Sequence, residues 1–299
     1  MRPLPLRLLP ALCLLVAGVA AAAAPAAGGK AVPATAPKSI AAPLWEFGLY
    51  NFVASIPHYP GSDQSQVYAF PTPFFTYRGK YLRATREGVR GIFYQGPYLE
   101  TSLSLSGNPP VNTSNRARAG MPGLDAIGEI GPSVKWFFLG RHPLDQLYLQ
   151  LSARAAASIG FSGGAQMRYQ GLAGGLGAVY LNRSRFLARH VRFHLGAGLN
   201  FADREYNGYF YNVSPTYATP ERPVYRSAAG LSDAYLSASV QYDLNPRVSF
   251  GSYARWDTVA DAVFADSPLV KQTNNFVVGA VVILRLFRSS TMVSSDDFE

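Results

Sequence analysis

Alternation of apolar and polar residues, repeated along most of the chain, is the feature that most restricts its fold. In "QLYLQLSARAAAS", which begins at Gln146, leucine or alanine occupies every second position and mostly polar residues lie between. Similar alternation occurs in "PYLETSLSLS" (97–106), "RFHLGAGLN" (192–200), "SDAYLSASVQYDL" (232–244) and "RVSFGSYARWD" (247–257). Because successive side chains of a strand point to opposite faces, each segment predicts a β-strand with one apolar and one polar face.

Strand length and the chemistry of the polar faces favour a membrane barrel over a soluble β-sandwich. Several alternating segments reach the length that a tilted strand needs to cross a bilayer. In lipid every backbone polar group must be paired, and a closed barrel achieves this because it has no edge. The polar faces carry charges that suit a water-filled or ion-paired lumen, namely Glu100, Glu129, Lys135, Arg154, Arg192 and Arg255. The sequence therefore predicts an all-β, antiparallel transmembrane β-barrel of about 12 strands, in the range of about 10–12.

The expected strands and their connections agree with this fold. The strands are expected at 45–56, 66–78, 80–86, 88–94, 97–106, 123–139, 145–158, 166–181, 190–201, 229–242, 247–257 and 274–287. If both chain ends are periplasmic, the outward connections include the long segments 57–65, 107–122, 202–228 and 258–273, whereas the inward ones are mostly short. This asymmetry is typical of outer-membrane barrels. The last strand is unusual because it is apolar on both faces apart from Asn274, Asn275 and Arg285.

The N-terminus indicates export. Arg2 and Arg7 precede an apolar stretch and a run of small residues, which predicts a signal peptide over residues 1–26. Residues 27–44 are rich in Ala, Pro and Gly and predict a disordered periplasmic linker, followed by an outer-membrane barrel at 45–287 and a short periplasmic tail at 288–299. Cys13 lies inside the signal, so the mature chain is expected to have no thiol, disulfide or cysteine metal site. The net charge of +9 comes mostly from arginine, and nucleic acid is not an expected partner after export.

Few residue combinations offer chemistry. "GFSGG" (160–164) matches a nucleophile elbow around Ser162, but an elbow needs a following helix, and this chain has no clear helix. His190 and His194 would meet on a helix but lie about 13 Å apart on a strand. His58, Ser62 and Asp63 share one loop, yet nothing in their spacing supports a hydrolase. The sequence predicts a protein that is not an enzyme, with no catalytic residue, no metal and no cofactor.

Two features leave alternatives open. The charges on the polar faces either pair with one another to fill a narrow barrel or line a selective pore. The loop "ADREYNGYFYNVSPTYATPERPVYRSAAG" is dense in Tyr and Arg, which are favoured in recognition surfaces. It either forms such a surface or folds over the mouth of its own barrel.

Four segments resemble the MipA/OmpV family of outer-membrane proteins. They are "YPGSDQSQVYAFPTPFFTYRG" (59–79), "AGMPGLDAIGEIGPSV" (119–134), "YNGYFYNVSPTYA" (206–218) and "ADSPLVKQTNNFVVGAVVILRLF" (265–287). The resemblance covers nearly all of the mature chain in order, with Asn212 where the family usually has glycine. It implies a non-enzymatic scaffold in the outer membrane that links a lytic murein (peptidoglycan) transglycosylase to a penicillin-binding murein synthase. A narrow porin-like channel for small polar solutes, or an adhesin, is the alternative.

The family has no agreed catalytic residues, so none are transferred to this chain. The motif loop consists of Tyr59, Pro60, Gly61, Ser62 and Asp63, and we interpret it as a structural motif. Pro60 fixes φ, Gly61 permits a tight turn, and Ser62 or Asp63 can accept a hydrogen bond from nearby backbone N–H groups. We expect this loop to plug or brace the barrel mouth.

Overall fold

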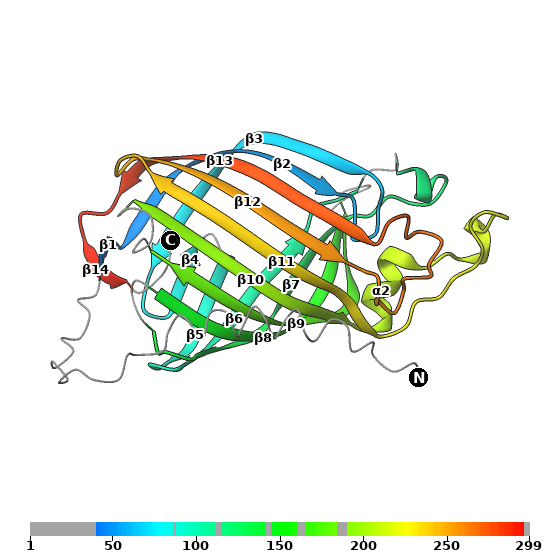
Figure 1. Ribbon diagram of the computed structural model, residues 1–299, viewed down its shortest axis with the longest axis horizontal. Coiled ribbons are helices and arrows are strands. Elements are labelled where there is room, and N and C mark those ends of the chain that lie inside the picture. The colour runs from blue at the N-terminus through cyan, green and yellow to red at the C-terminus, as the bar shows by residue number, and fades with distance from the viewer. Residues whose placement is uncertain are drawn as a thin grey trace, which may run out of the picture. The chain divides into compact units, whose positions relative to one another are not determined.

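Twelve antiparallel strands close into a barrel in the order β10-β11-β12-β13-β2-β3-β4-β5-β6-β7-β8-β9, so that β13 pairs with β2 (Figure 1). The strands are β2 Trp45–Pro57, β3 Ser65–Arg78, β4 Leu82–Thr85, β5 Gly88–Gln95, β6 Leu99–Asn108, β7 Ala126–Phe137, β8 Asp145–Gly160, β9 Gln166–Asn182, β10 Val191–Ala202, β11 Gly230–Asp243, β12 Val248–Thr258 and β13 Asn274–Arg288. The structure is a computed structural model that describes residues 40–85, 88–111, 115–141, 145–160, 166–183 and 190–295. The expected signal peptide lies outside these residues.

The prediction of an all-β transmembrane barrel is confirmed, and each of the twelve expected segments corresponds to one strand. Alternation was sufficient to locate them because each strand has one face toward the lumen and one toward the outside. β4, expected over 80–86, spans only Leu82–Thr85 and pairs with β3 only at Tyr77 and Arg78. The strands that form the wall are therefore shorter at β4 and β5 than elsewhere.

The outer surface of the barrel is apolar. On β8, Leu151 is 58% exposed, whereas Gln146, Ser152 and Ser158 on the opposite face are buried in the interior. Many aromatic side chains are exposed near the strand ends, among them Tyr81, Phe93, Tyr98, Trp136, Phe138, Phe276 and Phe287. Such girdles are typical of membrane barrels, whose outer face contacts acyl chains between two interfaces. Among the described residues, no helix combines the length and apolar character of a membrane span.

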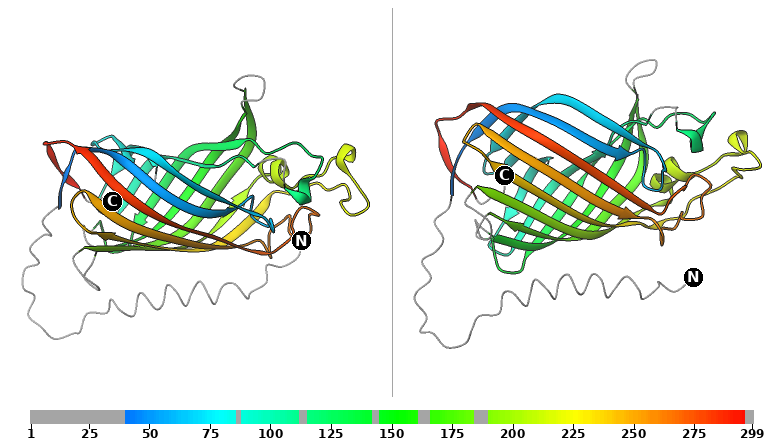
Figure 2. Two further views of the ribbon diagram at one scale, coloured as in Figure 1. Left: turned by 90° about the horizontal axis from the view of Figure 1, so that it is seen from above. Right: turned by 45° about the horizontal axis from the view of Figure 1, so that its top comes forward.

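The connections at the two ends of the barrel differ in length (Figure 2). One end, here the loop end, carries the long connections 58–64, 109–125, 203–229 and 259–273. The other, the turn end, carries the mostly shorter connections between β3 and β4, β5 and β6, β7 and β8, β9 and β10, and β11 and β12. This is the asymmetry expected from the sequence.

Two elements were not foreseen. β1 (Ile40–Pro43) and β14 (Met292–Ser295) pair antiparallel as a separate two-stranded ribbon at the turn end, within segments expected as a linker and a tail. The helix α2 (Arg204–Tyr211) corrects the expectation of a chain without a helix. It is short, aromatic and contains Gly208, so it gives no clear helical periodicity. Its N-cap is Asp203, which accepts a hydrogen bond from Tyr206 N at 2.8 Å.

Short 3₁₀ helices complete the loop end. The first, η1, spans Arg116–Arg118 in the connection between β6 and β7, and the second, η2, spans Pro215–Tyr217 after α2. α2 comes close to β9 at Gly171, where a side chain would place Cβ 2.2 Å from Asp203 Oδ1. Glycine at this position, with φ of +102°, therefore lets the N-cap of α2 rest on the barrel rim.

Candidate functional site

The lumen is the place where the charged residues gather. All six charges that alternation assigns to the polar faces lie on the inner face of the barrel or half-buried beside it: Glu100, Glu129, Lys135, Arg154, Arg192 and Arg255. Each of the six has a partner of opposite charge or an aromatic ring within reach. They fall into three groups, two toward the turn end and one below the loop end.

Glu100 is the centre of a buried basic cluster on β6. It is 2% exposed, accepts from Arg141 Nη1 and lies 3.5 Å from Arg90 Nη1. Lys135 is its cross-strand partner on β7, with Nζ 4.8 Å from the centre of the Tyr148 ring. One buried carboxylate is thus surrounded by three cations. Its removal would leave buried positive charge without a compensating negative charge.

A second group joins the lumen to the loop end. Arg154 Nε lies 2.9 Å from Glu129 Oε2, and Tyr206 OH of α2 donates to Glu129 Oε1 at 2.7 Å. On the opposite wall Arg255 Nη2 lies 2.6 Å from Asp257 Oδ1 and 3.6 Å from Asp233 Oδ1. The carboxylate of Glu129 therefore connects a lumenal arginine with the helix above it.

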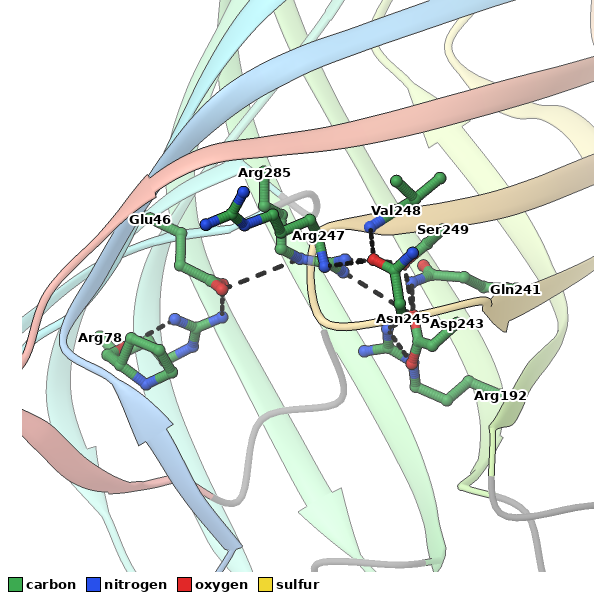
Figure 3. Close-up of polar contacts among 11 residues, drawn as sticks. Glu46, Arg78, Arg192, Gln241, Asp243, Asn245, Arg247, Val248, Ser249 and Arg285 are labelled. Atoms are coloured by element: carbon green, nitrogen blue, oxygen red, sulfur yellow. Dashed lines mark hydrogen bonds and ion pairs between the residues drawn. The ribbon is translucent and has the colours of Figure 1, made fainter.

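At the turn end, ion pairs run along the inner wall between nearby strands (Figure 3). Arg78 Nη2 lies 2.6 Å from Glu46 Oε2, and Arg285 lies between Glu46 and Asp243 at 3.8 Å from each. Asp243 in turn accepts from Arg192 Nη2 at 2.7 and 2.9 Å. These residues come from β2, β3, β10, β11 and β13, so one chain of charges ties five strands together.

The loop end is closed by a packed cap, defined here as the connections 58–64, 109–125, 203–229 and 259–273. Its apolar centre contains Tyr211, which stacks on Phe264 with ring centres 3.5 Å apart, and Val259 and Leu269, which are fully buried. Hydrogen bonds to backbone groups link the connections, because Tyr211 OH donates to Pro60 O at 2.7 Å and Arg118 Nη1 donates to Phe210 O at 2.8 Å. The Tyr-rich loop therefore lies over the mouth of its own barrel.

The motif loop lies inside this cap. Gly61 has φ of +96°, and its N–H donates to Asn275 Oδ1 at 2.6 Å, while Asn275 Nδ2 donates to Ser62 O at 2.8 Å. Tyr59 OH donates to Leu269 O at 2.9 Å, and burial raises the pKa of Tyr59 to about 12. Asp63 is at the edge, with one oxygen 3.2 Å from Arg116 Nη2. The motif thus connects the first strand hairpin to the last strand and to the other loops.

The residues considered for hydrolysis are not arranged as a catalytic set. Ser62 Oγ donates to Gln64 O and accepts from Asn115 Nδ2 at 3.1 Å, while His58 Nδ1 lies 2.9 Å from the same Asn115 Nδ2. Burial lowers the pKa of His58, and the nearby Asp63 carboxylate raises it in part. Ser162 and His142 lie outside the described residues, and His190 and His194 lie at the turn end of β10. Within the described chain, no group of three His, Cys, Asp or Glu residues could hold a metal.

Among the described residues, two cavities lie inside the barrel. One, of about 430 Å³, extends between Phe52 and Val281 on one side and Arg192 and Gln241 on the other. The second, of about 280 Å³, is lined by polar residues of β6, β7 and β8 and by Arg255. These features define a transmembrane β-barrel with a charged lumen and a cap at the loop end.

The sequence also identifies the family. The family described as "MltA-interacting protein MipA" matches residues 51–285, and the chain belongs to it. No curated protein matches the chain.

Among solved structures, the chain is similar to barrels at low sequence identity. The CymD monoaromatic hydrocarbon channel is 10% identical, with a TM-score of 0.31 and coverage of 85% of this chain and 90% of that one. The Pseudomonas putida toluene transporter TodX is 9% identical, with a TM-score of 0.31 and coverage of 80% and 88%. The Ralstonia pickettii toluene transporter TbuX is 9% identical, with a TM-score of 0.23 and coverage of 83% and 70%. Assignment to a family rests on the MipA match alone.

Proposed function

We propose that this protein is a non-enzymatic scaffold of the outer membrane that links a lytic murein transglycosylase to a penicillin-binding murein synthase. Membership of a family described as interacting with such an enzyme supports the proposal. In this proposal the loop end faces outward and the turn end faces the periplasm, as in other outer-membrane barrels. Residues 1–26 act as the signal peptide, and the segment from 27 connects it to the barrel.

The observation that carries the proposal is the ribbon of β1 and β14 at the turn end. Arg78 Nη1 of β3 holds the ribbon to the barrel by donating to Pro43 O at 2.7 Å, and the ribbon ladder continues toward the barrel where Leu44 N donates to Thr291 O at 2.9 Å. A two-stranded ribbon has two open edges, and an extended segment of a partner can add to such an edge through main-chain hydrogen bonds. The ribbon therefore offers a periplasmic enzyme a docking site of defined geometry.

The closed loop end favours a scaffold function and argues against an open pore. The cap covers the mouth with stacked aromatic rings and interlocked hydrogen bonds, and ion pairs line the inner wall at the turn end. Charges that pair with one another fill the interior instead of presenting a polar path. Function is then expected at the surfaces of the barrel.

Capture from a membrane extract tests the scaffold. The full-length protein, immobilised in mild detergent, is expected to retain both murein enzymes. Val293→Pro removes the N–H of a residue that pairs with Ala42 and should lower capture about tenfold. Val224→Pro, at an exposed position of the cap, is the matched control and should capture as well as the wild type. Absence of both enzymes from the wild-type eluate, or full capture by Val293→Pro, would contradict the proposal.

A narrow channel for small polar solutes is the second candidate, favoured by the two lumenal cavities. A third reading, an adhesin, would use the Tyr- and Arg-rich connection after β10. Solute uptake by proteoliposomes distinguishes the channel from the scaffold, because a scaffold gives no uptake above that of empty vesicles.

A further inference from the structure

The barrel wall has a lateral gap near the loop end. β4 and β5 form a short hairpin that reaches β3 only at Tyr77 and Arg78 and reaches β6 only as far as Leu103 (Figure 1). No described residue pairs with the second edge of β3 over Ser65–Thr76 or with that of β6 over Ser104–Asn108. We define the lateral gap by these two stretches. It lies between strands that face the membrane.

The sequence of β3 is adapted to this unpaired edge. His58 N donates to Gln64 O at 3.0 Å and Arg78 N donates to Leu44 O at 2.8 Å at the two ends of the β2–β3 ladder. Since hydrogen-bonded and non-hydrogen-bonded pairs alternate, the backbone nitrogens of Pro71 and Pro73 face away from β2, toward the gap. Proline has no N–H, so these two positions leave no donor unpaired in the membrane. They also prevent a peptide strand from completing a ladder on β3.

The inner wall beside the gap is apolar, unlike the rest of the lumen. Paired residues of β13, β2 and β3 place Tyr50, Phe52, Phe70, Phe74, Val281 and Ile283 on one inner face, which we call the apolar strip. Phe70 packs edge-to-face on Phe52 with ring centres 4.8 Å apart and is still 50% exposed. This strip explains why the last strand is apolar on both of its faces. A polar solute alone would not need such a wall.

The two cavities connect the gap with this strip. The cavity of about 280 Å³ reaches Ser104 and Leu105, the first residues of β6 beyond the β5 pairing. It shares His194 and Tyr253 with the cavity of about 430 Å³, which reaches Phe52 and Val281 of the strip. Cavities of these sizes are near those that hold small molecules, about 300–1,000 Å³. The two cavities therefore adjoin each other, and the smaller one ends beside the gap.

The rest of the lining is basic and polar. Arg90, Lys135, Arg192 and Arg255 line the cavities, each beside the carboxylate or aromatic partner described above, and no Asp or Glu is itself among the described lining residues. Two buried hydroxyls beside the gap, on Thr72 and Ser102, make no hydrogen bond with the described chain, and Ser102 is only 1% exposed. A ligand that covers both walls needs an apolar chain and an anionic, hydrogen-bonding head.

We propose that the lateral gap admits a single-chain anionic amphiphile of the fatty-acid class from the surrounding membrane into the lumen. Its chain lies along the apolar strip and its carboxylate faces the basic lining. The membrane is the source, because the cap closes the route from the loop end. The proposal goes beyond the scaffold role and does not depend on a murein enzyme.

The test uses the full-length protein in lipid nanodiscs that contain a palmitate analogue with a photoreactive diazirine near the chain end. Cross-links are expected in peptides that contain Phe52, Phe70 or Val281. Phe52→Ser should lower the yield of cross-links about tenfold, since it removes an aromatic contact of the chain. Val278→Ser, at an exposed position of the neighbouring strand β13 that lines neither cavity, is the matched control and should leave the yield unchanged.

A second pair of variants tests the route. Ser106→Trp places an indole on the inner side of β6 at the gap and should slow loading from the bilayer about tenfold, whereas Leu151→Trp on the lipid face of β8 should not. Faster migration of unheated protein on a gel confirms that each variant is folded. Cross-links only to outer-face residues overturn the proposal, and so does equal labelling by a neutral alcohol of the same chain length. Unchanged loading of Ser106→Trp overturns the lateral route.

Discussion

The two ends of this barrel are held together by different interactions. At the loop end, aromatic rings stack and mostly neutral side chains bond to backbone groups, as Tyr211 and Asn275 do. At the turn end, carboxylates and guanidinium groups of neighbouring strands pair along the inner wall, as Glu46 and Arg78 do. Apolar burial and neutral hydrogen bonds depend weakly on salt, whereas ion pairs that water can reach are screened. The comparison predicts that the stability of the loop end does not depend on ionic strength, whereas the stability of the turn end does.

The largest effect on stability is expected at Glu100, a carboxylate near the turn end that is only 2% exposed. Glu100→Gln leaves Arg90, Lys135 and Arg141 without the negative charge among them. Breaking a buried ion pair in this way costs about 3–5 kcal/mol, measured by urea unfolding of the barrel in vesicles. Glu221→Gln, an exposed residue of the cap, is the matched control. Equal midpoints for the two variants would show that the cluster does not stabilise the barrel.

A smaller loss is expected in the cap. Tyr211→Ala removes the ring stacked on Phe264 and the hydroxyl that donates to Pro60 O. Truncating a buried aromatic residue costs about 3 kcal/mol, so the cap connections should become sensitive to protease while the barrel stays folded. The exposed Tyr169→Ala serves as control. Protease resistance equal to that of the wild type contradicts the role given to the stacked rings.

Salt sharpens the comparison between the two ends. Asp243 is partly exposed and pairs with Arg192 at 2.7 Å, so Asp243→Asn should cost about 1 kcal/mol or less at low ionic strength. Most of this difference should disappear at high salt, where screening acts over about 3 Å. The effect of Tyr211→Ala should be the same at both salt concentrations. A salt-independent effect of Asp243→Asn would remove the distinction drawn between the ends.

The smallest effect is a pH dependence of the cap. Burial lowers the pKa of His58 from its ordinary 6.5, with Asp63 opposing the shift, so the folded cap binds this proton less readily than the unfolded chain. The cap should therefore be fully stable above pH 6.5 and lose stability as pH falls below that value. Protonation also removes the acceptor that His58 Nδ1 offers to Asn115 Nδ2. The protection of the Asn115–Arg118 amides from exchange, taken relative to the base-catalysed intrinsic rate at each pH, measures this, and His58→Asn should abolish its pH dependence. Protection that falls on raising the pH would contradict it.

How much the sequence reveals depends on the range of the interactions. Alternation identifies twelve strands and the inner side of residues such as Glu129, because period two is a local property of a strand. It does not reveal that Tyr206 donates to Glu129, since that contact requires the loop end to fold over the barrel. The pairing of β1 with β14 is invisible for the same reason, because the two segments lie at opposite ends of the chain.

The lateral gap could have been predicted from the sequence. Pro71 and Pro73 stand at alternate positions of one expected strand, and proline in a strand indicates an unpaired edge. The expected lengths of the neighbouring segments 80–86 and 88–94 hid this signal, because they imply a full pair of strands. α2 was harder to predict, because its sequence is short and aromatic and Asp203 is its only helix start signal.

The central claim is that the lumen of the intact protein is closed to ions at the loop end, so that its functional surfaces are the ribbon and the membrane-facing wall. Planar-bilayer recording of the purified, folded protein tests it directly. The intact protein should give no steady ohmic current, and replacing residues 203–229 with a short Gly-Ser linker should produce one. A steady current through the intact protein, equal to that of the variant without the loop, would contradict the account.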